Sequence, residues 1–319
     1  MDRREKGLAG REPETYLFIS LMTNRYCLID IGTNNVLLLL AEIDTGEYHI
    51  IKRLNRISAL AEGMEAGNLS KDGIDRVKNI LREYITIAEK YDAEPVLIGT
   101  SALREAENRY ILEDWLEKEY SIPLRLITGD EEARLNGIAN INEFTHENIL
   151  LFDIGGGSTE FTLITKGEIR DIQSIDLGIR RFHNRFGDEA YQEVGYLRLK
   201  LNLITIRIPS GTMLVGIGGT VTSLAAMLQN MTVYNENKVH KYQITKVQLD
   251  KLFSEIANTP EDQVLERIAF NPLSKALLMA GGIIVREIIA HFNASNFFVS
   301  DRTWQYGVLK EIITGRYVV

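Results

Sequence analysis

The stretch Asp153-Ile-Gly-Gly-Gly-Ser-Thr-Glu160 follows the apolar run 149–152 and precedes an alternating run, residues 161–164. This order predicts a strand, a tight turn and a second strand. Glycine has no Cβ, so three glycines in succession let the backbone bend sharply and bring its N–H groups close to an anion. We therefore interpret the turn as a phosphate site, although an ordinary glycine hairpin would have the same pattern. The expected phosphate contacts are Gly155, Gly156, Gly157 and Ser158.

The same opening occurs 123 residues earlier, in Asp30-Ile-Gly-Thr-Asn-Asn35, which lies between two apolar runs. A repeated motif indicates an internal duplication. Each half of the chain is therefore predicted to begin with a meander of strands, and the two turns are expected to hold phosphate from both sides of one cleft. This arrangement resembles the actin-like ATPase and sugar-kinase superfamily. In the first turn the expected phosphate contacts are Gly32, Thr33 and Asn34.

Three carboxylates accompany these turns. Asp30 and Asp153 each end a predicted strand, and Glu160 follows seven residues after Asp153. Carboxylate oxygens only accept hydrogen bonds, and they suit a hard cation such as Mg²⁺, with Mn²⁺ as the alternative. We expect these three residues to place the metal, directly or through water, so that it bridges to phosphate oxygens.

Composition limits the kinds of protein that this chain can be. Its 319 residues are 45% hydrophobic and 25% charged, which is typical of a globular protein with room for two domains. The net charge of −8 argues against a nucleic-acid partner. No apolar run approaches the roughly 18 residues of a membrane span. The single cysteine, Cys27, lies in an apolar run and is expected to be buried, so we predict a cytoplasmic protein with no membrane partner.

A further glycine turn, Gly216-Ile-Gly-Gly-Thr220, follows an apolar run and opens a predicted helix over 221–228. The N–H groups at a helix N-terminus bind anions, so this is a second expected phosphate site. It lacks the third glycine of a dinucleotide-binding motif, which argues against a Rossmann domain. The expected contacts are Gly218, Gly219 and Thr220.

Basic residues occur beside these turns. Arg104 opens a helix after the predicted strand 95–98, and it is expected either to hold phosphate or to pair with Glu105 or Glu107. A cluster after the second meander is expected to bind phosphates distal to the cleaved one. His183 and His240 are expected to be solvated surface histidines, and a helix is expected over 189–206. The residues of the cluster are Arg180, Arg181, His183 and Arg185.

Five ordered motifs together resemble the exopolyphosphatase/guanosine pentaphosphate phosphatase (Ppx/GppA) family. The resemblance implies an α/β fold of two ribonuclease-H-like domains flanking a phosphate-binding cleft. It also implies release of terminal phosphate from inorganic polyphosphate or guanosine pentaphosphate, a role in the stringent response and a homodimer. The catalytic carboxylate of the family falls on Glu132. The motifs are Asp30–Asn34, Gly99–Asn108, Thr128–Leu135, Asp153–Glu160 and Gly216–Thr220.

The chain is predicted to divide into three parts. Residues 1–21 are expected to be a disordered leader. Residues 22–128 with 301–319 are predicted to form the first domain, and residues 129–300 the second. This corresponds to the short, two-domain form of the family.

Some positions depart from the family pattern. The usual serine at the end of the first motif is Asn35, the Pro-x-Arg-x-Asp pattern is replaced over 272–276, and Gly-Leu-Arg-Glu-Gly is replaced over 303–307. These departures leave two other interpretations open. One is a weakly active or non-catalytic member that binds polyphosphate or an alarmone, and the other is a small-molecule kinase on the same fold.

Overall fold

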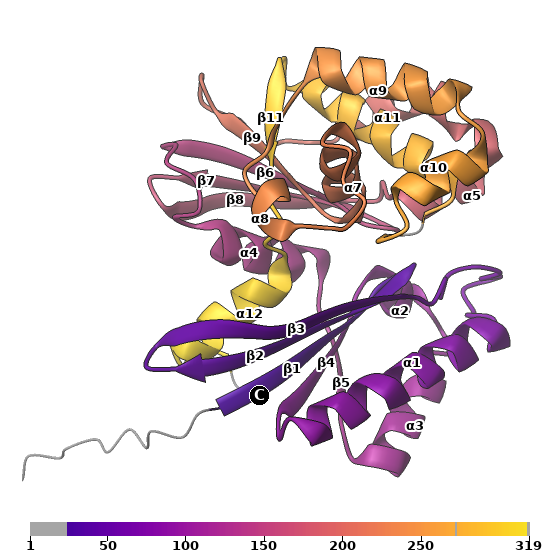
Figure 1. The fold of residues 1–319 in the computed structure, drawn as a ribbon, viewed down its shortest axis with the longest axis vertical. Coiled ribbons are helices and arrows are strands. Elements are labelled where there is room, and N and C mark those ends of the chain that lie inside the picture. The colour runs from indigo at the N-terminus through magenta and orange to yellow at the C-terminus, as the bar shows by residue number, and fades with distance from the viewer. Residues whose placement is uncertain (1–23, 272, 318–319) are drawn as a thin grey trace, which may run out of the picture.

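A computed structural model describes the protein over residues 24–271 and 273–317. The predicted leader, residues 1–21, lies outside the described residues. The described chain forms two β-sheets, one above the other, with helices on both faces of each sheet (Figure 1). The predicted α/β fold class is therefore confirmed.

The first sheet has the strand order β3-β2-β1-β4-β5. β1, β2 and β3 are antiparallel neighbours, while β4 and β5 run parallel to β1. A meander followed by parallel strands on the other side of β1 is the ribonuclease-H-like topology that the sequence predicts. The strands are β1 (Asn24–Ile31), β2 (Asn35–Asp44), β3 (Glu47–Ile57), β4 (Glu94–Gly99) and β5 (Leu124–Leu126).

The second sheet repeats this order as β8-β7-β6-β9-β11, with β10 added antiparallel at the edge beside β11. The predicted duplication is therefore present in the topology as well as in the motifs. β6 and β7 are buried on both faces, and β6 accordingly contains the continuous apolar run 149–152. The strands are β6 (Asn148–Ile154), β7 (Thr159–Thr165), β8 (Glu168–Ile175), β9 (Met213–Ile217), β10 (Gln243–Thr245) and β11 (Asn296–Val299).

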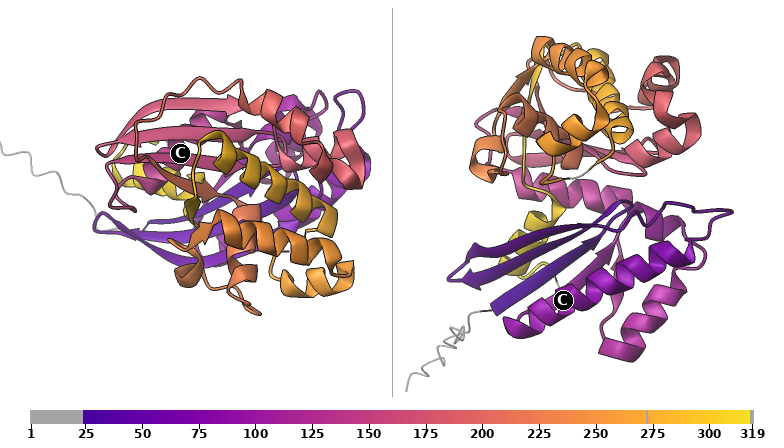
Figure 2. Two further views of the ribbon diagram at one scale, coloured as in Figure 1. Left: turned by 90° about the horizontal axis from the view of Figure 1, so that it is seen from above. Right: turned by 45° about the vertical axis from the view of Figure 1, so that its right-hand side comes forward.

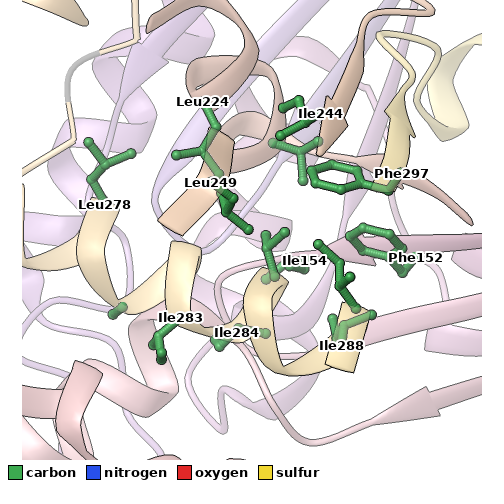
Figure 3. Close-up of a cluster of buried hydrophobic side chains, with 14 of the residues drawn as sticks. Phe152, Ile154, Leu224, Ile244, Leu249, Leu278, Ile283, Ile284, Ile288 and Phe297 are labelled. Atoms are coloured by element: carbon green, nitrogen blue, oxygen red, sulfur yellow. The ribbon is translucent and has the colours of Figure 1, made fainter. Parts of the chain in front are cut away.

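Helices cover the outer faces of both sheets. Below the first sheet, α1 buries the predicted stripe that begins at Ile74, and Ser70 caps the helix by accepting a hydrogen bond from the Gly73 amide. Above the second sheet, α11 packs Ile284 and Ile288 into the core that contains Phe152 (Figure 3). The helices outside the layer between the sheets are α1 (Lys71–Lys90), α2 (Ser101–Glu105), α3 (Tyr110–Tyr120), α5 (Ile179–Phe186), α6 (Val194–Leu201), α7 (Gly219–Leu228), α8 (Glu236–Val239), α9 (Lys246–Asn258), α10 (Glu261–Arg267) and α11 (Lys275–His291), of which α2 and α8 border the cleft.

Two helices, α4 (Gly129–Asn140) and α12 (Trp304–Ile313), lie between the sheets (Figures 1 and 2). α4 packs on β7 and β8 of the second sheet and along α12. Leu135 of α4 and Leu309 of α12 join the core on the facing side of the first sheet, next to Leu28 and Leu39. The halves therefore share a helical layer, and α4 brings its first turn to the space between them. The predicted domain boundaries stay a prediction.

One predicted element is wrong. The expected helix over 189–206 is instead a 3₁₀ helix over Gly187–Gln192 followed by α6, which ends at Leu201. The chain then contains β-branched residues over 204–206, which favour helices weakly. Gln173 of β8 also accepts a hydrogen bond from the Thr205 amide and donates one to the Leu203 carbonyl. These contacts hold the segment in an irregular path along the sheet.

Candidate active site

The two predicted phosphate turns have the same geometry. Gly32 donates its amide to the Asn35 carbonyl at 2.9 Å, and Gly155 donates to the Ser158 carbonyl at 3.0 Å. Each bond closes a four-residue turn between paired strands, β1 with β2 and β6 with β7. The predicted order of strand, turn and strand is therefore confirmed in both halves.

The turns lie against each other across the two halves of the molecule. A Cβ on Gly156 would be 2.8 Å from the Thr33 methyl carbon, and a Cβ on Gly178 would be 2.5 Å from the Gly156 carbonyl carbon. Real side chains do not approach this closely. Glycine is required at 156 because the Thr33 side chain packs against its backbone, and at 178 because the start of α5 meets the second turn backbone to backbone.

A cavity of about 550 Å³ opens beside these turns. It extends from the ends of β1 and β6 toward β3, and its walls come from both halves of the chain. Twelve residues predicted for the glycine turns, the metal site and catalysis line it, so the duplicated motifs meet in one place. These residues are Asp30, Gly32, Thr33, Asn34, Glu132, Asp153, Gly155, Gly156, Ser158, Gly218, Gly219 and Thr220.

Four predicted residues do not line the cavity, namely Arg104, Gly157, Arg181 and Glu160. Arg104 donates to the Ile127 carbonyl at 2.8 Å and lies 3.4 Å from Glu132, so the expected pairing with Glu105 or Glu107 is wrong. Arg181 donates to the Gly157 carbonyl at 2.7 Å and pairs with Glu105 of the other half at 2.5 Å. The structure therefore places Arg104 and Arg181 as supports of cavity-forming groups.

The fourth of these residues, Glu160, stands directly opposite Asp153 in the β6–β7 pair and accepts a hydrogen bond from Ser174 at 2.9 Å. The corresponding pair in the first half is Asp30 with Leu37. The duplication therefore keeps one strand-end aspartate in each half and adds a second carboxylate only in the second half.

Four carboxylates share this buried region, and burial is the main cause of the raised pKa of each. Burial, with a smaller contribution from the charge of Asp153, raises the pKa of Glu132 to about 7, against the lowering effect of Arg104. Burial raises the pKa of Asp153 to about 6. Burial and neighbouring carboxylates raise the pKa values of Asp30 and Glu160 well above the usual range. A bound cation would relieve this shared repulsion.

The three carboxylates predicted to place the metal fit a bound cation in part. Oδ1 of Asp30 is buried and has no hydrogen-bond partner among the described residues. Within residues 24–271 and 273–317, no three His, Cys, Asp or Glu side chains are arranged to hold a metal by themselves. Mg²⁺ is commonly held by one or two carboxylates, with water and substrate phosphate completing its shell. Asp30 and Asp153, which both line the cavity, therefore fit Mg²⁺ better than the predicted set of three, because Glu160 lies off the cavity.

The histidine predictions have different outcomes. His183 lies near the surface beside Asp188, at 2.9 Å. The prediction of a solvated surface position is wrong for His240, whose side chain is only 10% exposed and lies 3.2 Å from Glu143. Its Nδ1 accepts the amide hydrogen of Asp301 at 3.3 Å, so Nε2 carries the proton toward Glu143. His240 therefore supports the backbone of a cavity-lining residue.

The profile of the Ppx/GppA phosphatase family matches residues 39–314. This chain belongs to the Ppx/GppA family. It is 30% identical over 290 residues to exopolyphosphatase 2 of Mycobacterium tuberculosis, covering 83% of this chain and 90% of that protein. It is also 30% identical over 327 residues to a bifunctional 3-dehydroquinate synthase/phosphatase of Fusobacterium nucleatum, covering 94% of this chain, and it spans 49% of the length of that relative.

Solved structures agree with this assignment. The Ppx/GppA family member of Aquifex aeolicus superposes with a TM-score of 0.76 at 26% identity, over 93% of this chain and all of that one. An exopolyphosphatase of Cytophaga hutchinsonii superposes with a TM-score of 0.82 at 24% identity, over 92% of this chain and 99% of that one, and it shares the fold. The predicted family and its two ribonuclease-H-like domains are confirmed.

This Ppx/GppA member has a row of side-chain amides that the motifs do not predict. Asn34 donates to Asn35 at 2.7 Å, Asn35 to Asn55 at 2.8 Å, and Asn55 to Asn271 of the other half at 3.1 Å. Asn271 then donates to the Gly219 carbonyl at 3.1 Å. Asn35, which departs from the family pattern, is thus part of a row that joins the first glycine turn to the third.

Arg180, the first residue of the basic cluster, lies on the cavity wall. It donates to Asn34 across the cleft. Its Nε is buried and has no hydrogen-bond partner among the described residues. Arg180 is therefore a cation positioned beside the first glycine turn.

The end of the cavity far from the glycine turns contains paired charges. Arg53 of β3 pairs there with Glu236 and Asp301 of the other half, and Asp301 also accepts a hydrogen bond from Tyr234 at 2.7 Å. Apolar side chains form much of the wall between this end and the glycine turns. They include Leu37, Leu54, Phe270, Leu273 and Leu277.

Proposed function

We propose that this Ppx/GppA member hydrolyses the terminal phosphoanhydride bond of inorganic polyphosphate, with Mg²⁺ as the metal and Glu132 as the general base. One observation carries the proposal: Glu132 faces the cavity from the first turn of α4, beside both glycine turns, and its pKa is raised to about 7. A base with a pKa near the working pH is best suited to accept a proton in the transition state.

The residues around Glu132 support this role. The amides of the two turns and the N-terminus of α7 would bind the oxygens of the terminal phosphate. Mg²⁺ held by Asp30 and Asp153 would neutralise negative charge on those oxygens. Arg104 holds the Glu132 side chain from behind, at 3.4 Å. Arg181 would act indirectly, through the carbonyl of Gly157.

The proposed hydrolysis needs no covalent enzyme intermediate. A water molecule attacks phosphorus in line with the leaving oxygen, and Glu132 accepts one of its protons as the new P–O bond forms. The bond to the shortened polyphosphate breaks, and its oxygen leaves with the electron pair. Orthophosphate is released.

A second substrate, guanosine pentaphosphate, is favoured by one observation. The cavity wall beyond the glycine turns is largely apolar, and its one arginine, Arg53, is already paired with two carboxylates. Such a wall suits an uncharged organic group better than a chain of phosphates, because desolvating phosphate is unfavourable.

One assay separates these substrates from the two rival interpretations. Phosphate release is measured with polyphosphates of several lengths, guanosine pentaphosphate and ATP, without any acceptor. We expect release from polyphosphate. A small-molecule kinase would transfer phosphate only when an acceptor is present, and a non-catalytic sensor would bind without release; either result contradicts the proposal.

Mg²⁺ is expected to raise the melting temperature more at about pH 8 than at about pH 6. The pKa values of Asp153 and Glu132 are raised to about 6 and about 7 in the folded protein, so the fold favours their protonated forms. This contribution to stability is fully present below the ordinary carboxyl pKa of about 4, and it is lost as the pH rises through about 6 and 7. The ionised carboxylates then repel one another until a cation binds. Thermal melts with Mg²⁺, and with NaCl at matched ionic strength, test this. An equal Mg²⁺ effect at both pH values would contradict it.

Arg180→Ala is expected to raise KM for polyphosphate, because this half-buried cation lines the cavity beside the first glycine turn. A charge-assisted contact is worth about 1.5–3 kcal/mol, which corresponds to roughly 10- to 100-fold. Arg185 is the matched control, because it is exposed and stacks on the Tyr196 ring at 4.9 Å. Steady-state kinetics should show a change for Arg180→Ala and none for Arg185→Ala.

Location and assembly stay predictions. Among the described residues, no helix is both long and apolar enough to cross a membrane. We propose a cytoplasmic homodimer with no nucleic-acid partner and a role in the stringent response. Size-exclusion chromatography with light scattering tests the oligomeric state.

A further inference from the structure

Asn136 is a buried polar residue that no motif predicts. It lies on α4 one turn after Glu132, so both side chains are on the same face of the helix. Its side chain is 1% exposed, and its Nδ2 donates to Oδ2 of Asp153 at 2.8 Å. Among the described residues, no other side chain donates to Asp153. Helix α4 thus carries both Glu132, the proposed base, and Asn136, the hydrogen-bond donor to Asp153.

The two oxygens of Asp153 face different surroundings. Oδ2 is bound to Asn136 on α4, whereas Oδ1 lies next to Gly218, where a Cβ would be only 2.8 Å away. Gly218 lines the cavity and has a φ of 97°. The asparagine therefore occupies one oxygen and leaves the other beside the cavity wall at Gly218.

Packing on both sides keeps Asn136 in place. On one side of α4, Thr162 of β7 donates to the Ala133 carbonyl at 2.7 Å, and a Cβ on Gly137 would be 2.9 Å from the Thr162 methyl carbon. On the other side, Gly307 of α12 meets the backbone of Leu135. The helix cannot slide without breaking these contacts, so the backbone of Asn136 is held in place beside Asp153.

We propose that Asn136 is a positioning residue, which orients Asp153 so that Oδ1 is available to the metal. The inference rests on the proposed function for the use of that metal. Groups that hydrogen-bond to metal-binding side chains typically change metal affinity or activity by 10- to 100-fold when they are removed. A purely structural role would instead affect stability alone.

The test compares Asn136→Leu with Thr162→Val. Each variant removes one buried hydrogen bond between α4 and its surroundings, and only the first touches Asp153. Melting temperature is recorded as Mg²⁺ is titrated into the substrate-free protein, and kcat and KM are measured with polyphosphate. For Asn136→Leu we expect the Mg²⁺ concentration at half-maximal stabilisation to rise about 10- to 100-fold, with a lower kcat and little change in KM.

Thr162→Val should lose melting temperature without any change in the Mg²⁺ midpoint. Asn136→Ser, which keeps a polar donor and leaves room for a bridging water, should recover part of the Mg²⁺ affinity and serves as the second variant if Asn136→Leu does not fold. An unchanged Mg²⁺ midpoint in both Asn136 variants would overturn the proposal. If the wild type releases no phosphate but the Asn136 variants still need more Mg²⁺ than the wild type for half-maximal stabilisation, the proposed function fails and this inference stands.

Discussion

Glu132→Gln is expected to lower kcat by about 10²- to 10⁴-fold, which is the usual contribution of a general base. Glutamine keeps the shape of glutamate and cannot accept the proton of the attacking water. The side chain faces the cavity and is oriented by Arg104 rather than by substrate, so substrate binding should change little. Steady-state kinetics and isothermal titration with a short polyphosphate would measure the two effects separately.

The neighbouring carboxylate provides the matched control. Thr128 caps α4 by accepting a hydrogen bond from the Glu131 amide at 3.1 Å, and the Glu131 side chain turns away to pair with Arg125. Glu131→Gln should therefore keep near-full activity. If Glu131→Gln is inactive and Glu132→Gln is active, the assignment of the base is wrong.

Gly307→Val is expected to destabilise the protein by about 3 kcal/mol or more, at the upper end of the usual cost of overpacking. A Cβ on Gly307 of α12 would be 2.8 Å from the Leu135 carbonyl carbon and closer still to its oxygen. A backbone carbonyl cannot rotate away as the end of a flexible side chain can. The two helices would have to separate, and α4 would carry Glu132 away from the glycine turns.

Gly195→Val is the control for this substitution. Gly195 also lies in a helix, α6, but a Cβ at this position would meet no atom within 4 Å beyond its own helical turn and chain neighbours. Glycine is about as unfavourable as valine or more so in a helix, so the expected change is within about 0.5 kcal/mol. Chemical unfolding of both variants, with phosphate release measured alongside, tests the pair. Similar stability losses for both variants would contradict the packing argument.

The parts of the molecule that follow from local sequence could be predicted. Apolar runs interrupted by glycine decide the two strand–turn–strand units around Gly32 and Gly155, because the turn needs residues without Cβ and the strands need two buried faces. The duplication then places both turns at one cleft. The choice of Glu132 over Glu131 followed only from the family resemblance, since the two residues have the same chemistry.

Contacts between segments far apart in the chain could not be predicted. Asn271 meets Asn55 across the cleft, and Arg53 meets Asp301, over separations of more than 200 residues in each case. Asparagine and arginine occur on most protein surfaces, so no local pattern distinguishes these residues. The prediction for His240 is wrong for the same reason, because its burial depends on Glu143 and on the chain around Asp301.

The position of α12 also has a consequence for synthesis on the ribosome. Trp304, Val308 and Leu309 complete the core on the cleft-facing side of the first sheet, beside Leu28 and Leu39. Helix α4 covers part of that apolar face early in synthesis, but the part beneath α12 stays uncovered until the chain has been translated beyond residue 313. Domains usually fold in order as they are synthesised, and exposed apolar surface invites aggregation or chaperone binding. The first half to be made is therefore the last to be finished, and a ribosome that stalls before α12 would release a protein whose first sheet is partly exposed.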